Sequence, residues 1–320
     1  MKSISYYLKR LKDIYASHYI PVFKQSPYPQ NFQEDTNRAN SLIYSKLLTG
    51  KPCMISRFGS NELYATISYM RGGHPLWFLR TIYPFWVSPQ VDYHMKNNAG
   101  FFNSSHKAYC KFADLMVKCA KEIDILGSWQ ENEYTMNKYL SCERVHLDSL
   151  VPFFANEPWT KYLEGKKVLV VHPFKETIIQ QYKKRQCLFD NNEILPTFSK
   201  LTVIKAIQSL GGNNNGFTSW FEALHYMEQK IDKADYDVAL IGCGAYGMPL
   251  AAHCKKMGKQ AIHLGGVLQV LFGIKGKRWE TEEYYKDKYH LLMNNPNWTY
   301  PINEDKPQNY NKVEKSCYWN

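Results

Sequence analysis

Residues 237–276 read DVALIGCGAYGMPLAAHCKKMGKQAIHLGGVLQVLFGIKG. The apolar run 237–241 predicts a buried strand, and residues 248–257 predict a helix that Gly258 ends. Residues 260–264 predict the next strand. We therefore expect a strand–helix–strand unit, with a glycine turn where the first strand passes into the helix.

The glycine turn contains Gly242, Gly244 and Gly247 in the spacing G-x-G-x-x-G. Glycines let the backbone approach a ligand, and a helix N-terminus presents N–H groups to a phosphate. A nicotinamide site would also need an acid near the end of the second strand, where residues 263–266 read HLGG. The pattern favours a nucleotide or nucleotide-sugar over NAD or flavin, and it leaves open a tight turn without a ligand.

Two further apolar runs, residues 52–58 and 168–171, are expected to join these strands in one sheet. The sequence predicts an α/β, Rossmann-like fold with a mainly parallel sheet and helices on both faces. Residues 1–33 are interpreted as an N-terminal helix and linker, and residues 34–285 as the catalytic domain. Residues 286–320 are interpreted as a polar tail that is poorly packed or lies along the surface.

Composition limits the class of partner. The 320 residues carry a net charge of +11 and a pI of about 9.1, which suits an acidic partner. No nucleic-acid motif is present, so nucleic acid is not expected. The eight cysteines form no C-x-x-C pair, and there is no secretory signal or membrane-length apolar run. These features indicate a reducing, cytoplasmic location.

The start of the chain has an amphipathic pattern. Ile4, Leu8, Leu11 and Tyr15 share one face of a predicted helix over residues 1–19, and basic residues lie elsewhere on it. The helix could contact the inner face of a membrane peripherally, or pack on the body of the protein.

Candidate catalytic residues follow from their positions. Arg57 and His172 each end a predicted strand, where ligands bind in α/β sheets, and Glu62 begins the next helix. Glu222 lies in the first turns of a helix predicted over residues 217–231. Glu62, Glu222 and His172 could each act as a base, although both acids have a plain explanation as helix-start residues.

A basic loop follows the strand–helix–strand unit. Lys275 lies between two glycines, and Arg278 follows soon after. We predict a mobile cationic loop that clamps a diphosphate, with a solvated basic loop as the alternative.

Residues 55–62 read ISRFGSNE and resemble the R-x-G-D-G-E segment of the GT-D-type glycosyltransferases. Residues 241–279 are similar to the terminal Rossmann-like portion of that family, and the likeness spans residues 51–280. It implies a hexosyltransferase that moves a sugar from a nucleotide-diphosphate donor, expected to be a UDP-sugar. The implied acceptor is a glycan or lipid-linked glycan, in the synthesis of bacterial surface polysaccharide or glycoprotein.

The resemblance also implies residue roles. Arg57, Gly59, Ser60 and Asn61 would bind the nucleotide-sugar together with Gly242, Gly244, Gly247, Lys275 and Arg278. Glu62 matches the second acid of the family's D-x-E, which lies beside Mn²⁺ or Mg²⁺, but Ser60 stands where the first acid should be. One carboxylate and a hydroxyl make a weaker site for a hard cation, so metal dependence stays open.

Other functions remain compatible with the glycine turn. A Rossmann-type methyltransferase or dehydrogenase could use it, and so could a non-catalytic nucleotide-binding protein. The missing acid after the second strand argues against the two enzymes.

Overall fold

The computed structural model describes residues 35–70, 89–306 and 317–319. The predicted helix over residues 1–19, and the whole segment 1–33, lie outside the described residues. Within the described ranges, no helix combines the length and apolar character needed to span a bilayer.

The described residues form one seven-stranded sheet in which every strand pair is parallel. The strands lie in the order β3-β2-β1-β7-β6-β4-β5. They are β1 (Cys53–Ser56), β2 (Ile125–Ser128), β3 (Glu143–His146), β4 (Lys167–His172), β5 (Lys200–Lys205), β6 (Val238–Ile241) and β7 (Gln260–His263). The predicted strand–helix–strand unit is confirmed as β6, α8 and β7, and the four predicted strands share this sheet.

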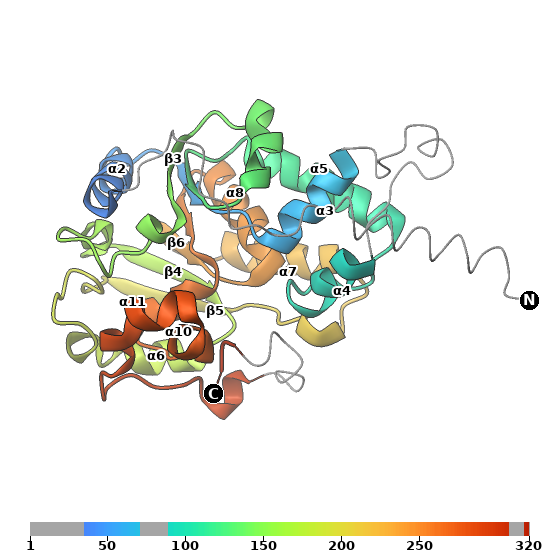
Figure 1. Cartoon of the computed structure of the whole chain (residues 1–320). Helices are drawn as coiled ribbons and strands as arrows, with labels where there is room; N and C mark the ends of the chain where they lie inside the picture. Colours follow the sequence, from blue (N-terminus) through green and yellow to red (C-terminus); the bar gives the residue numbers. More distant parts are fainter. Residues whose placement is uncertain (1–34, 71–88, 307–316, 320) are drawn as a thin grey trace, which may run out of the picture.

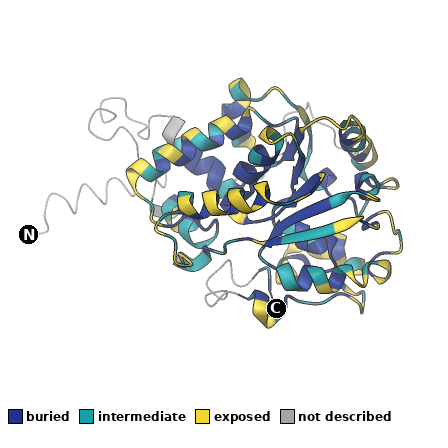
Figure 2. Ribbon diagram, turned by 180° about the vertical axis from the view of Figure 1, so that it is seen from behind, coloured by how far each residue is buried: buried dark blue, intermediate teal, exposed yellow. Residues whose placement is uncertain are grey.

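Two hydrophobic cores lie on opposite faces of the sheet because successive side chains of a strand point to opposite sides. In β4, Val168 and Val170 belong to one core, whereas Leu169 and Val171 belong to the other. All four side chains are almost completely buried. Figure 2 shows burial concentrated in the sheet, with exposed residues on the outer sides of the helices.

Helices cover both faces, as predicted, and Figure 1 shows the two groups. The first group is α3 (Ser60–Met70), α4 (Pro89–Asn97), α5 (His106–Ala120), α7 (Trp220–Asp232) and α8 (Gly247–Lys256). The second group is α2 (Thr36–Leu48), α6 (Lys175–Tyr182), α9 (Leu268–Leu271), α10 (Lys277–Thr281) and α11 (Glu283–Met293).

The chain changes direction between β4 and β6, which are neighbours in the sheet. After β4 the chain continues outward to β5 through α6, whereas after β6 it continues the opposite way to β7 through α8. Helices α6 and α8 therefore lie on opposite faces and leave a crevice between them at the carboxyl ends of the strands. Open α/β sheets bind ligands at such a switch point.

The end of the chain differs from the expected polar surface tail over residues 286–320. Helix α11 continues to Met293, Trp298 packs into a core, and Trp319 is completely buried. These large apolar side chains are spaced too far apart to form a local hydrophobic pattern, so their burial could not be read from periodicity.

Candidate functional site

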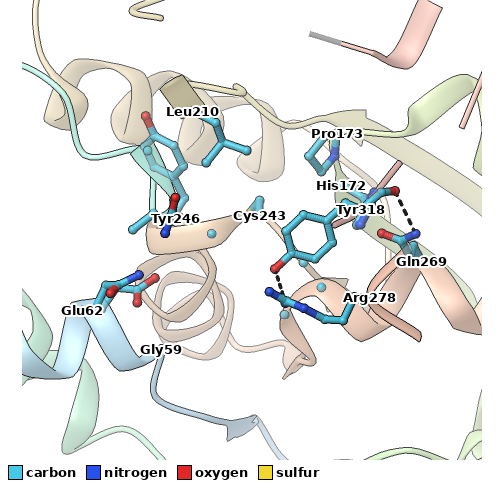
Figure 3. A pocket seen from close by; sticks show the side chains of 18 of the residues that line it. Gly59, Glu62, His172, Pro173, Leu210, Cys243, Tyr246, Gln269, Arg278 and Tyr318 are labelled. Carbon is cyan, nitrogen blue, oxygen red and sulfur yellow. Dashed lines mark hydrogen bonds between the residues drawn. The ribbon is translucent and has the colours of Figure 1, made fainter. Parts of the chain in front are cut away.

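A cavity of about 300 Å³ opens at the carboxyl edge of the sheet. Residues from the loops that follow β1, β2, β4, β5, β6 and β7 line it, together with residues of α10 and the C-terminal segment. Figure 3 shows Glu62 on one side of this pocket and the hydrogen-bonded pair of Arg278 and Tyr318 on another. The sheet thus brings the switch point and several predicted site residues into one crevice.

The segment after β1 supplies Arg57, Gly59, Ser60, Asn61 and Glu62, all of which line the pocket. Helix α3 begins at Ser60, so Glu62 lies in its first turn, and its carboxylate folds back over Gly59. A Cβ atom on Gly59 would overlap that carboxylate. A side chain at position 59 would therefore displace the Glu62 carboxylate from this place.

Arg57 is a cation at the floor of the pocket. Its guanidinium carbon lies 5.3 Å from the centre of the Trp129 ring, and Nη1 lies 3.5 Å from where a Cβ of Gly265 would be. Its Nε is buried and has no hydrogen-bond partner among the described residues. An unpaired buried donor is costly, and a charged one more so. An anionic ligand in the pocket would satisfy it.

The loop after β2 holds Trp129 beneath Arg57. The carboxylate of Glu133, which is fully buried, accepts hydrogen bonds from the Ser128 hydroxyl and from the N–H groups of Trp129 and Gln130. The Trp129 indole N–H in turn donates to the Phe58 carbonyl at 3.0 Å. Burial raises the pKa of Glu133 to about 7. The sequence alone assigns no role to this acid. Glu133 does not line the pocket, but its hydrogen bonds fix the loop that carries Trp129.

Contacts within the protein explain the glycines of the G-x-G-x-x-G turn. A Cβ on Gly242 would overlap the Gly265 carbonyl, and one on Gly247 would overlap the His263 ring. Gly244 has a φ of +57° and lies against the Ala99 carbonyl. Gly242 and Gly244 line the pocket, whereas Gly247 is not among the lining residues.

Two N–H groups of the turn are already bonded. The Gly242 N–H donates to the Val171 carbonyl at 3.0 Å, and the Ala245 N–H donates to the Ala99 carbonyl at 3.1 Å. The turn is expected from its sequence to offer its backbone N–H groups to a phosphate. Carbonyls of the protein already accept two of these groups, so fewer remain for a ligand.

Two histidines lie buried at the strand ends. The Nδ1 atom of His172 accepts the Phe174 N–H at 3.1 Å, and Nδ1 of His263 lies 3.1 Å from the Ser56 hydroxyl. Burial lowers the pKa of both to about 3, so both rings are neutral at physiological pH. His172 lines the pocket with its proton on Nε2. It is thus arranged to donate a hydrogen bond and is poorly suited to the predicted role of base.

Glu222 lies away from the pocket. Its carboxylate accepts hydrogen bonds from the N–H and hydroxyl of Thr218, at 2.7 and 2.6 Å, just before α7. The hydroxyl bond lowers the pKa of Glu222 below its usual value. Glu222 is not among the lining residues, and these contacts match its alternative interpretation as a helix-start acid.

The basic loop after α9, predicted from the sequence to be mobile, is joined to Thr299 by backbone contacts. Ile274 forms a bridge with Thr299, and the Lys275 N–H donates to the Thr299 carbonyl at 2.7 Å. Lys275 is not among the residues that line the pocket, whereas Arg278 is. Arg278 Nη1 donates to the Tyr318 hydroxyl at 2.7 Å, and Nε contacts Glu282 Oε1 at 3.3 Å.

The described part of the pocket offers few side chains of its own to hold a metal ion. Among the described residues no group of three or more His, Cys, Asp or Glu side chains is arranged to bind one. Glu62 contributes one carboxylate, and its pocket neighbours Ser60 and Asn61 contribute neutral groups. Mg²⁺ is commonly bound by one or two carboxylates together with substrate phosphates, so a metal ion here would need phosphate oxygens from a ligand as well as Glu62.

Comparison with known proteins leaves the family open. No family model matches the chain, and no curated protein matches it. Two solved structures are similar over 79% of this chain and 91% of their own length. One is a selenomethionine-substituted structure of domain of unknown function 1792, with 12% identity and a TM-score of 0.42. The other, with 13% identity and a TM-score of 0.39, is of the same domain and is described as having a distinct glycosyltransferase fold. Superpositions this loose establish neither a family nor an activity for this chain.

Proposed function

We propose that this protein is a glycosyltransferase that moves a sugar from a nucleotide-diphosphate donor, most simply a UDP-sugar, to a glycan acceptor. The observation that carries the proposal is the buried Arg57 Nε in the pocket, which has no acceptor among the described residues. A diphosphate oxygen would accept the hydrogen bond from Arg57 Nε, and its negative charge would balance that of the guanidinium.

Arg57 and Arg278 are proposed to bind the diphosphate from two sides. Both line the pocket, and both guanidinium charges act to lower the pKa of the Tyr285 phenol, which burial raises overall. Together they could stabilise the charge that develops on a departing nucleoside diphosphate, without a metal held by the protein.

Glu62 is proposed to act on the reacting sugar or on the acceptor hydroxyl. It is an acid of the pocket with its carboxylate placed by Gly59, and Ser60 and Asn61 lie beside it as neutral hydrogen-bonding groups. A carboxylate in this position could take the acceptor proton as a general base. His172 could donate a hydrogen bond from Nε2 to the donor.

Sugar transfer is favoured over the other chemistries by two features. The resemblance of residues 55–62 to the GT-D segment points to glycosyl transfer, and Arg57 and residues 59–62 of that segment line the pocket. The loop after β7 carries Gly265 and Gly266 where an NAD enzyme would carry an acid. The proposed setting is surface-glycan synthesis at the inner face of a bacterial membrane, with residues 1–19 as a peripheral contact.

A thermal-shift panel tests the donor class. UDP, UDP-glucose, GDP-mannose, NAD and S-adenosylmethionine are added to the protein, each with and without Mn²⁺. We expect a nucleoside diphosphate or its sugar to raise Tm, and NAD and S-adenosylmethionine to leave it unchanged. Arg57→Ala should weaken binding of the active nucleotide at least about tenfold, the scale of a hydrogen bond to a charged group.

Arg185→Ala is the matched control. Arg185 lies over the Tyr182 ring at 5.3 Å, as Arg57 lies over Trp129, but it is not among the residues that line the pocket. The control variant should bind the nucleotide like the wild type. If no nucleoside diphosphate shifts Tm, or if Arg57→Ala binds it unchanged, the proposal is wrong.

A further inference from the structure

The last described residues, 317–319, are built into the wall of the pocket. The Cys317 carbonyl accepts the Arg278 N–H at 2.8 Å, and the Trp319 carbonyl accepts the Lys277 N–H at 3.1 Å. Between them, the Tyr318 carbonyl accepts a hydrogen bond from Gln269 Nε2 at 3.3 Å. Because three successive carbonyls are bonded, the Tyr318 side chain has a defined direction.

Gly266 provides the space for the Tyr318 ring. A Cβ on Gly266 would lie 2.5 Å from Tyr318 Cε1, and the backbone of Gly266 is not in the left-handed region. Glycine is therefore needed here for room and not for its dihedral freedom. The preceding residue, Gly265, differs: a Cβ there would make only ordinary contact with Arg57 Nη1, at 3.5 Å, and its φ of +68° is what favours glycine.

Tyr318 contacts Arg278 with both its hydroxyl and its ring. The hydroxyl accepts from Nη1 at 2.7 Å, and the guanidinium carbon lies 4.7 Å from the ring centre. A protonated phenol hydroxyl can orient a guanidinium by a hydrogen bond without cancelling its charge. One carboxylate partner, Glu282, has a side chain that is 47% exposed, so solvent screens its attraction to Arg278.

We propose that Tyr318 is a positioning residue that holds the Arg278 guanidinium toward the diphosphate of the donor. This inference rests on the proposed function, since it assigns the anion that Arg278 meets. Both glycines after β7 line the pocket: Gly265 lies in contact with Arg57, and Gly266 makes room for the tyrosine that orients Arg278.

The test measures Kd for inorganic pyrophosphate and for UDP by calorimetry. Tyr318→Phe keeps the ring and removes the hydroxyl, and it should weaken both ligands about three- to tenfold. In the Arg278→Ala background the same substitution should have no further effect, because Tyr318 acts through Arg278. A merely structural role would lower the affinity in both backgrounds.

Two more variants complete the design. Tyr300→Phe is the matched control, since the Tyr300 hydroxyl donates to Glu280 of the same helix α10 and Tyr300 is not among the lining residues. It should leave both Kd values unchanged. Gly266→Ala displaces the ring while keeping the hydroxyl, and it should weaken pyrophosphate at least as much as Tyr318→Phe does. This variant keeps the test decisive if Tyr318→Phe folds poorly.

The outcomes separate the two proposals. A wild-type protein that binds neither pyrophosphate nor UDP overturns the proposed function and this inference with it. Wild-type binding with unchanged affinity in Tyr318→Phe and Gly266→Ala overturns the inference alone. Tighter binding in either variant also overturns it, because the C-terminal segment would then compete with the ligand.

Discussion

Gly59 leaves open the space in which the Glu62 carboxylate lies. The Glu62 carboxylate occupies the space that a side chain at position 59 would take, and Glu62 is only 8% exposed. A carboxylate at the start of a helix is also stabilised by the helix dipole. The position of Glu62 suits either a stabilising role at the helix start or a catalytic role, and a substitution can distinguish the two.

Glu62→Gln is expected to lower the transfer rate by about 100-fold or more, because an amide cannot take a proton. Donor affinity should change by less than about twofold, since the diphosphate is assigned to the arginines. The measurement is kcat with saturating donor, alongside donor Kd and Tm.

Glu222→Gln is the control for Glu62, because Glu222 is also a helix-start acid and is not among the lining residues. Its variant should keep full transfer activity. If Glu62→Gln is equally active and loses only about 0.3–1 kcal/mol of stability, Glu62 is a helix-start acid and not a catalytic group.

At the scale of elements, the loop after β2 depends on one buried carboxylate. Glu133 accepts from Ser128, Trp129 and Gln130, and so fixes the ring on which Arg57 lies. Because burial raises the pKa of Glu133 from 4.5 to about 7, the folded state binds this proton more tightly than the unfolded state does. The carboxyl group therefore favours folding at low pH and opposes it as the pH rises toward 7.

Glu133→Gln is expected to remove this pH dependence. An amide can still accept the two backbone N–H groups and donate to the Ser128 hydroxyl, so the loop should persist. Between pH 5 and 8 the wild type should lose up to about 3 kcal/mol of unfolding free energy relative to the variant. Urea unfolding of both proteins at the two pH values measures this difference. Stability curves that run parallel would show that Glu133 does not titrate in this range.

The glycine turn before α8 is also an element-scale feature, and its explanation differs from its sequence pattern. The spacing suggests a dinucleotide fingerprint, yet all three glycines are in contact with other parts of the protein. Close packing between the turn and the loop after β7 requires Gly242, and the His263 ring requires Gly247. The same spacing arises here from packing at the switch point, where strand ends crowd together.

At the scale of the whole molecule, the two cores draw on segments spread along the described chain, from Ala39 in α2 to Trp319. Deleting residues 1–19 should leave Tm unchanged and weaken binding to anionic vesicles, if the basic amphipathic pattern serves a membrane surface. Vesicle co-sedimentation and a melting curve measure the two effects. A deletion that unfolds the protein, combined with a full chain that ignores vesicles, would make that helix structural.

The sequence alone determined the parallel α/β architecture and the edge at which the site lies. The side chains of a strand such as β4 pack into two cores, so consecutive residues of the strand are apolar. This pattern can be recognised within a few residues of sequence. Placing Arg57, Glu62 and His172 at strand ends was also possible locally, because strand ends in a parallel sheet meet at one edge.

Only the tertiary structure decided which candidates share the pocket. Glu62 and Glu222 have the same local context at a helix start, yet of the two only Glu62 lines the cavity, because α3 begins shortly after β1 whereas a long loop separates α7 from β5. Tyr318 contacts Arg278, forty positions away in the chain. Sequence patterns report local periodicity and turn chemistry, whereas the contact between Tyr318 and Gly266 depends on where two distant segments meet.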